Sequence, residues 1–276
     1  MNNGTASPGI RGKKQWDILV IDDEQVIIDA VVKICSSENF IVDSAIDAQI
    51  ALTKLVKNIY RLIICDIMMP GMDGFEFLDE LNIRKINSAL IMTTGFSTVD
   101  NAVRSLYSGA IDFIPKPFTT DELLSSVIRG MKYIEIQSLL RTQKDDSAVV
   151  YVPCPAKYYR LGYSSWASEE STGSILIGAT DLFIKTIDNF SGIELLSADE
   201  ELIQGNSCAY FKDQSERVFT LLSPVTGRIL EANTGIIEDK TLLEKDSYFE
   251  GWLYRVLPSD SEYELEKLIN CSSDRL

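Results

Sequence analysis

The sequence predicts an α/β domain with a doubly wound parallel sheet, followed by a mainly β domain. In the first half, short apolar runs alternate with helical patterns, whereas after about residue 149 strand-like runs follow one another between Gly, Ser, Asn and Asp. Alternating strands and helices are typical of a parallel sheet, and consecutive short strands are typical of an antiparallel one. The 276 residues suffice for two ordinary domains.

Five apolar runs of the first half are predicted strands. They lack the polar alternation of a half-exposed strand, which is typical of a sheet covered by helices on both faces. We therefore predict a (βα)5 domain over residues 14–131, preceded by a flexible tail over 1–13. The predicted strands lie within WDILVIDDE (16–24), FIVDSA (40–45), RLIICDIMMPGMDG (61–74), ALIMTTGF (89–96) and IDFIPKPF (111–118).

Polar residues stand where four of these strands end. The carboxyl ends of parallel strands share one edge of a sheet, where function gathers. A single acid at a strand end is more often a turn or cap residue, but the joint pattern favours a site. Clustered carboxylates indicate a hard cation, here Mg²⁺, and a carboxylate beside Mg²⁺ and a lysine can attack phosphorus. These residues are Asp22, Asp23, Glu24, Asp66, Thr93, Thr94 and Lys116.

The motifs VIDDE, CDIMMPGMDG, MTTGF and GAIDFIPKPF resemble the receiver domain of two-component response regulators. The resemblance implies phosphorylation by a sensor histidine kinase, with Mg²⁺ as cofactor, and a cis peptide between Lys116 and Pro117. It also implies that phosphorylation changes the face formed by the fourth helix, the fifth strand and the fifth helix. The implied roles are Asp66 as phospho-acceptor, Asp22, Asp23, Asp66 and the Met68 carbonyl as metal ligands, Lys116 as partner of the phosphoryl group, and Thr94 and Phe113 as switch residues.

The segment TTDELLSSVIRGMKYIEIQSLLRTQKDD (119–146) repeats apolar residues at helical spacing and extends beyond a last receiver helix. We predict a helical linker over 132–148, although Gly130 weakens a continuous helix by about 1 kcal/mol. Two interpretations stay open. The extension either pairs with a second copy in a homodimer, or it forms a core face followed by a solvated tail.

Residues 149–276 are predicted to form a small antiparallel β domain with one helical insert, TDLFIKTID, and a terminal helix, SEYELEKLIN. Three of its segments, SILIGATDLF, LLSPVTGRILEAN and YFEGWLYRVLPSDSEYELEKLI, resemble the H protein of the glycine cleavage system. That resemblance implies a flattened barrel-sandwich of the lipoyl-carrier type, whose hairpin presents a lipoyl-lysine. The predicted strands lie within AVVYV, SILIGAT, SCAYF, VFTLL, GRILEAN and GWLYRVL.

The lipoyl position departs from the H-protein pattern. The modified lysine of that family stands seven residues before the serine of Ser-Pro-Val, which is Ser223 here, and Glu216 occupies that place. A glutamate cannot form the amide to lipoate, so we expect no cofactor there and an output domain that acts by protein contact. The alternative is a lipoyl carrier modified on Lys212, which lies an even four residues upstream, so it could share a strand face with position 216 but would be off the tip.

Composition excludes several classes of function. A net charge of −15 disfavours nucleic acid and anionic membranes, and no apolar run reaches 18 residues. The chain has no histidine, which excludes hydrolysis by a His base, and we expect no enzyme in the β domain. Five cysteines without a CxxC pair and a polar N-terminus lead us to expect a cytoplasmic protein with reduced thiols and an output partner that the sequence does not identify.

Overall fold

A computed structural model describes residues 13–142 and 151–272 of the chain. The chain divides into two compact units, Met1–Ser88 and Ala89–Leu276, each with its own buried apolar residues. Of the tail predicted over 1–13, all but residue 13 lies outside the described residues. Among the described residues, no helix is long and apolar enough to cross a bilayer.

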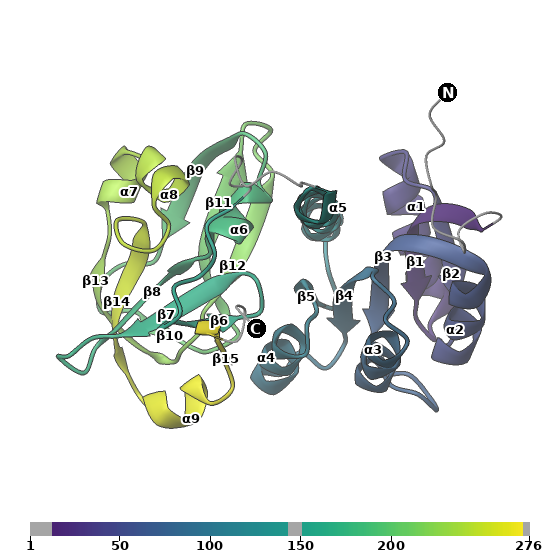
Figure 1. Cartoon of the computed structure of the whole chain (residues 1–276), viewed down its shortest axis with the longest axis horizontal. Coiled ribbons are helices and arrows are strands. Elements are labelled where there is room, and N and C mark those ends of the chain that lie inside the picture. Colours follow the sequence, from purple (N-terminus) through teal and green to yellow (C-terminus); the bar gives the residue numbers. More distant parts are fainter. Residues whose placement is uncertain (1–12, 143–150, 273–276) are drawn as a thin grey trace. The chain divides into compact units, whose positions relative to one another are not determined.

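The first unit is built on three parallel strands. Its elements are β1 (Lys14–Ile21), α1 (Gln25–Ser37), β2 (Val42–Ala45), α2 (Ala48–Lys57), β3 (Asn58–Asp66) and α3 (Gly74–Ile83). Strand β1 pairs with both β2 and β3, while α1 lies on one face of the strands and α2 and α3 lie on the other (Figure 1). The last residues of β1 and β3 are therefore buried on both sides, which explains their unbroken apolar runs.

The second unit begins with two further parallel strands and their helices. These are β4 (Ala89–Thr94), α4 (Val99–Tyr107), β5 (Asp112–Pro115) and α5 (Thr120–Thr142). The five strands form one sheet in the order β2-β1-β3-β4-β5, which confirms the predicted doubly wound architecture. Helix α5 continues through the buried Gly130 into the region predicted as a linker, and residues 143–148 of that prediction lie outside the described residues.

The rest of the second unit is a mainly antiparallel β domain, as predicted. One sheet has the order β10-β13-β14-β8-β7-β6-β15 and the other the order β12-β11-β9 (Figure 1). Its core includes Phe183, Phe211 and Tyr254. The elements are β6 (Tyr159–Leu161), β7 (Ser165–Glu169), β8 (Ile175–Ala179), α6 (Asp181–Lys185), β9 (Phe190–Leu195), β10 (Glu201–Leu202), β11 (Ser207–Asp213), β12 (Val218–Leu222), β13 (Gly227–Ala232), α7 (Gly235–Glu238), α8 (Thr241–Lys245), β14 (Trp252–Pro258), α9 (Ser261–Leu265) and β15 (Ile269–Asn270).

Three local predictions for the β domain differ from the structure. The predicted terminal helix ends at Leu265, because Ile269 and Asn270 pair with β6 instead. Of the run AVVYV, the described residues Tyr151 and Val152 are not in a strand. Helices α7 and α8 were not predicted, because helices of four or five residues are too short to show a helical period.

Candidate functional site

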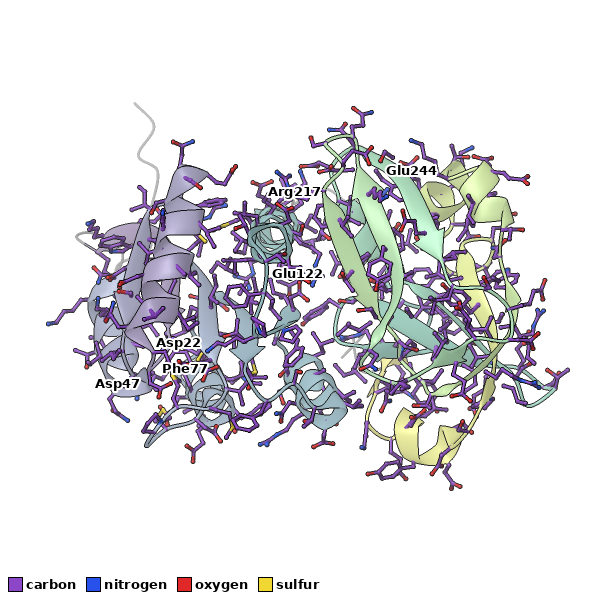
Figure 2. All side chains as sticks on the ribbon, turned by 180° about the vertical axis from the view of Figure 1, so that it is seen from behind. Asp22, Asp47, Phe77, Glu122, Arg217 and Glu244 are labelled. Carbon is purple, nitrogen blue, oxygen red and sulfur yellow. The ribbon has the colours of Figure 1, made fainter. Side chains whose placement is uncertain are left out.

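Two buried carboxylates lie at the ends of neighbouring strands in the first unit. The register of β1 and β3 pairs Ile21 with Cys65, so Asp22 and Asp66 take adjacent positions just beyond that pair. Their side chains are among the few buried acids, at 2% and 3% exposure, and Asp22 is labelled in Figure 2. Two such carboxylates side by side repel each other unless a cation or a proton compensates them.

Short-range hydrogen bonds orient both carboxylates. Asp22 Oδ1 accepts a hydrogen bond from Glu24 N at 3.0 Å, and Asp66 Oδ2 accepts one from Met68 N at 2.9 Å. Helix α3 begins close to the end of β3, because a Cβ atom on Gly74 would lie 2.5 Å from the Asp66 carbonyl oxygen. Only glycine fits this approach, so Gly74 helps to define the shape of the loop after Asp66.

The available carboxylates suit Mg²⁺ better than a metal ion that is held by protein ligands alone. In the stretches 13–142 and 151–272, no three Asp, Glu or Cys side chains are grouped closely enough to hold a metal ion. Mg²⁺ commonly uses one or two carboxylates and completes its shell with water and phosphate oxygens. Asp22 and Asp66 provide such a pair, whereas Asp23 is exposed, and its role and that of the Met68 carbonyl stay predictions.

A second polar group lies at the ends of β4 and β5 in the second unit. The strand register pairs Thr94 with Pro115, and Lys116 N donates to the Thr94 carbonyl at 2.8 Å. Thr94 is completely buried, Lys116 is half-buried, and the peptide between Lys116 and Pro117 is cis, as predicted. The backbone thus holds Lys116 next to Thr94.

Thr94 is also connected to the loop that follows it. Its Oγ1 accepts a hydrogen bond from Phe96 N at 3.1 Å, so the hydroxyl and the loop backbone are linked. Phe113 on β5 is buried at 9% exposure, and its register partner on β4 is Met92. The two predicted switch residues, Thr94 and Phe113, therefore lie on paired strands, and their switching stays a prediction.

In the β domain, the hairpin tip is organised by Asp213. This buried carboxylate accepts hydrogen bonds at Oδ1 from Ser215 N at 2.8 Å and from Arg217 N at 3.0 Å. Its Oδ2 lies 3.4 Å from Arg217 Nη1. Glu216, at the tip between β11 and β12, is exposed and has a φ of +61°, in the left-handed region. An aspartate that accepts hydrogen bonds from the following backbone N–H groups is a turn signal that can be read from the sequence.

The structure corrects the inference that Lys212 shares a strand face with position 216. Strand β11 ends at Asp213 and the chain then reverses, so the alternation of strand faces does not extend to Glu216. Lys212 instead pairs with Val218 across the hairpin, and its ammonium makes an ion pair with Glu194 on β9. That hydrogen-bonded pair raises the pKa of Lys212 above its ordinary value.

A buried arginine lies beside the start of β5 and was not predicted. Arg129 on α5 is 5% exposed, forms an ion pair with Asp112 at 2.8 Å and donates to the Ile111 carbonyl at 2.7 Å. Its other end lies 3.5 Å from Ser164 Oγ in the β domain. A lone arginine in a helical pattern ordinarily indicates a solvated face, so no signal in the sequence marks this one.

Comparison with known proteins identifies two separate regions. Residues 18–128 match the family described as response regulator receiver domain, and residues 157–274 match the family described as glycine cleavage H-protein. No residue belongs to both regions, and residues 129–156 lie between them.

Curated relatives and solved structures resemble the same two regions. The transcriptional regulatory protein HprR of Escherichia coli is 40% identical over 40% of this chain, which spans only 49% of that relative. The response regulator MprA of Mycobacterium leprae is 26% identical over 83% of this chain and 91% of its own length. The NtrX receiver domain of Brucella abortus is 37% identical, with a TM-score of 0.40 over 42% of this chain and 98% of that one. A glycine cleavage system H protein of Mycobacterium marinum is 23% identical, with a TM-score of 0.38 over 44% and 94%.

Proposed function

We propose that this chain, which joins a receiver domain of the response regulator family to a domain of the glycine cleavage H-protein family, accepts a phosphoryl group on Asp66 from a sensor histidine kinase. The single observation that carries the assignment of Asp66 is the pair of buried carboxylates, Asp22 and Asp66, at adjacent strand ends. The β domain then signals by protein contact, without a lipoyl group.

The chemistry assigned to Asp66 is a phosphoryl transfer. A carboxylate oxygen of Asp66 forms a bond to phosphorus as the bond between phosphorus and a histidine nitrogen of the donor breaks. The donor histidine belongs to the kinase, since this chain has none. Mg²⁺, held by Asp22 and Asp66 with Asp23 and the Met68 carbonyl as proposed further ligands, would neutralise charge on the transferred group.

Lys116 and Thr94 complete the proposed site. The order of the sheet, with β3 next to β4 and β4 next to β5, supports bringing their strand ends to the edge that carries Asp66. A phosphoryl group bound to the protein carries nearly two negative charges. The Lys116 ammonium would pair with its oxygens. The Thr94 hydroxyl would then donate to one of these oxygens, and Phe113 would repack behind it.

The first prediction tests the acceptor. Incubation with acetyl phosphate and Mg²⁺ should add one phosphoryl group to the wild-type chain and none to Asp66→Asn, as measured by intact mass. Asp29→Asn, an exposed acid on α1, is the matched control and should be labelled like wild type. EDTA should abolish labelling of the wild-type chain. Equal labelling of Asp66→Asn would show that another residue is the acceptor.

A second candidate function is a lipoyl carrier controlled by the receiver domain, with Lys212 modified. The match of residues 157–274 to the H-protein family favours it, because that match includes the hairpin. Two observations support the first candidate instead. Glu216 occupies the position of the lipoyl-lysine, and the Lys212 ammonium is paired with Glu194.

The output of the proposed regulator is a contact with another protein, whose identity is not given by any feature of the chain. The relatives HprR, MprA and NtrX are named as regulators, which supports a signalling protein over an enzyme. The net charge of −15 supports a protein partner over nucleic acid. We further propose that the protein works in the cytoplasm, where sensor kinases phosphorylate their regulators.

A further inference from the structure

Trp166 on β7 is completely buried, although it points away from the main core of the β domain. Its neighbour along the strand, Ala167, belongs to that core, and so does Ile177, the partner of Ala167 on β8. Successive side chains of a strand point to opposite faces, so Trp166 lies on the other face of the sheet. It is 0% exposed there because a second, smaller cluster of residues covers it.

This second cluster is mainly aromatic. The centroids of the Tyr158 and Tyr248 rings lie 5.0 Å and 6.0 Å from that of the Trp166 ring. Trp252 packs against the same group. Beneath it, the Trp166 ring lies over bare backbone, since a Cβ atom on Gly178 would be 2.6 Å from the ring. We call the four side chains of Tyr158, Trp166, Tyr248 and Trp252 the aromatic cluster.

Part of the cover of the aromatic cluster comes from residues 151–156, which we call the strap. The strap directly precedes residues 157–274, the region that matches the glycine cleavage H-protein family. Its residue Cys154 is 6% exposed and belongs to the same buried group as Trp166 and Tyr248, whereas Val152 is 47% exposed. The strap therefore turns the small Cys154 side chain toward the aromatic rings.

Two buried side chains hold the backbone of the strap at Val152. The Val152 N–H donates to Asp181 Oδ2 at 2.7 Å, and the Val152 carbonyl accepts from the Tyr248 hydroxyl at 3.0 Å. The same hydroxyl accepts from Asp181 N at 3.3 Å, so the two holding groups are connected to each other. Both contacts use main-chain groups of the strap, so they suit any extended segment that offers an N–H and a carbonyl at this place.

The strap sequence, YVPCPA, favours an extended conformation of the polyproline II type. Proline fixes its own φ at about −65° and disfavours a helical conformation of the residue before it, so Pro153 and Pro155 also restrict Val152 and Cys154. Residues 151–156 accordingly lie in neither a helix nor a strand. Segments of this type lose little conformational entropy when they bind, and aromatic-lined surfaces are the sites that recognise them.

The strap has fewer means of attachment than the sheet beneath it. Pro153 and Pro155 have no N–H to donate, and residues 151–156 do not pair with a strand as β7 and β8 do. Segments outside the hydrogen-bonded ladders commonly open by local unfolding while the rest of the domain stays folded. Such an opening would uncover Trp166 and Tyr248, the residue types that most often anchor protein interfaces.

We propose that the aromatic cluster is a binding surface for proline-rich extended segments and that the strap occupies it as an intramolecular ligand. The partner is a protein segment whose N–H and carbonyl take the places of those of Val152 and whose small apolar side chain takes the place of Cys154. The strap must leave before such a segment binds, so it inhibits the contact. The inference goes beyond the proposed phosphorylation of Asp66 and does not depend on it.

The full-length chain with a released strap tests this inference. Cys154→Asp places a charge in the apolar cluster and should expel the strap, whereas Val152→Asp places the same charge at an exposed position and is the matched control. The probe is a fluorescein-labelled peptide of residues 151–157, YVPCPAK, whose binding is measured by fluorescence anisotropy under reducing conditions. A tethered strap competes at a millimolar effective concentration, so the probe should bind Cys154→Asp at least about 10-fold more tightly than wild type or Val152→Asp.

A second peptide tests the part played by proline. YVACAAK, in which alanine replaces both prolines, should bind the Cys154→Asp chain several-fold more weakly than YVPCPAK. Equal binding of the two peptides would overturn the recognition of proline-rich segments. Equal binding of YVPCPAK to all three chains would overturn the role of the strap. No binding to a Cys154→Asp chain whose circular dichroism matches wild type would overturn the whole inference.

Hydrogen exchange of the wild-type chain decides the matter if Cys154→Asp does not fold. The Val152 amide should exchange through a local opening that low urea concentrations do not change, at least about 10-fold faster than the amides of β7. Exchange of Val152 only through global unfolding would show that the strap does not leave the folded domain, and it would overturn the inference.

Discussion

At the scale of the single residue, the hairpin tip has a glutamate at the position where the H-protein pattern predicts the lipoyl-lysine. Asp213 holds the tip by bonding to Ser215 N and Arg217 N, and Glu216 is exposed between them with a left-handed backbone. The position is thus presented to solvent, as a modified residue must be. The Glu216 side chain lacks the amine that is needed to form an amide with lipoate.

Lipoylation of the hairpin is therefore expected to depend on residue 216 alone. With lipoate, ATP and a lipoate ligase, the wild-type chain should gain no lipoyl group, whereas Glu216→Lys should gain one, as measured by intact mass. Gln214→Lys places an amine on the same tip two residues away and is the matched control, with no gain expected. A lipoyl group on Lys212 of the wild-type chain would instead support the carrier function.

Gly95 leaves the loop after β4 open. A Cβ atom at this position would meet no other atom within 4 Å, so a side chain here starts in open space. If Asp66 is the acceptor, Gly95→Met should shield the acyl phosphate from water and lengthen its lifetime several-fold, followed as loss of the phosphoryl mass. Gly95→Ala should have a smaller effect. A wild-type lifetime of many hours would contradict an open site.

At the scale of the element, Arg129 connects α5 to the start of β5. Its ion pair with Asp112 is largely buried, with 6% and 15% of the two side chains exposed, and removing one partner of a buried pair leaves an uncompensated charge. Arg129→Met should therefore lower the free energy of unfolding by about 3 kcal/mol in urea titrations.

The control for Arg129 is an exposed pair. Arg84, the C-cap residue of α3, and Glu80 on that helix are 42% and 31% exposed, so Arg84→Met should cost below about 1 kcal/mol. The double variant Arg129→Met with Asp112→Asn should recover part of the loss, since no carboxylate then stays buried alone. Equal effects of Arg129→Met and Arg84→Met would contradict a buried, structural ion pair.

Helix α5 was predicted from the spacing of its apolar residues. It is longer than a helix needs to be to cover the sheet of a receiver domain. Near its end, Leu139 and Leu140 are 49% and 41% exposed. Such an exposed pair agrees both with a homodimer and with a solvated tail, so the homodimer stays a prediction. If the homodimer forms, analytical ultracentrifugation should show a mass that increases with protein concentration.

At the scale of the whole molecule, acids dominate the response to pH. The chain has no histidine, so no side chain with an ordinary pKa titrates between pH 5 and 8. Burial raises the pKa of Asp43, but hydrogen bonds from Lys54, Tyr60 and Ser44 outweigh it and hold this pKa below its ordinary value. A depressed carboxylate pKa stabilises the folded state above the unfolded pKa of about 3.9, and this contribution is lost as pH falls through the folded pKa.

The free energy of unfolding should therefore be nearly constant from pH 6 to 8 and should fall below about pH 4. Asp43→Asn removes one of the responsible groups, so its stability should depend less steeply on pH in the acid range. Asp29→Asn, on the exposed surface of α1, is the matched control. A steep change in wild-type stability near pH 6.5 would contradict this account.

The sequence by itself determined which polar side chains stand at the strand ends. Asp22, Asp66, Thr94 and Lys116 each follow an apolar run, and the parallel order of strands and helices brings such ends to one edge whatever the packing details. The glutamate at the position where the H-protein pattern predicts a lipoyl-lysine was equally readable, because it is a matter of identity at one position. Both results depend only on which residues follow one another along the chain.

Only the tertiary structure decided how distant segments meet. Nothing in the sequence of α4 distinguishes a core face on its own sheet from one shared with Gly162 and Gly205, since apolar spacing reports that a face is buried and not what buries it. The same holds for Arg129, whose buried position depends on its contacts with Asp112 and Ser164, which are distant from it in the sequence. Partners separated by many residues are selected by packing in three dimensions, which a pattern along the chain does not encode.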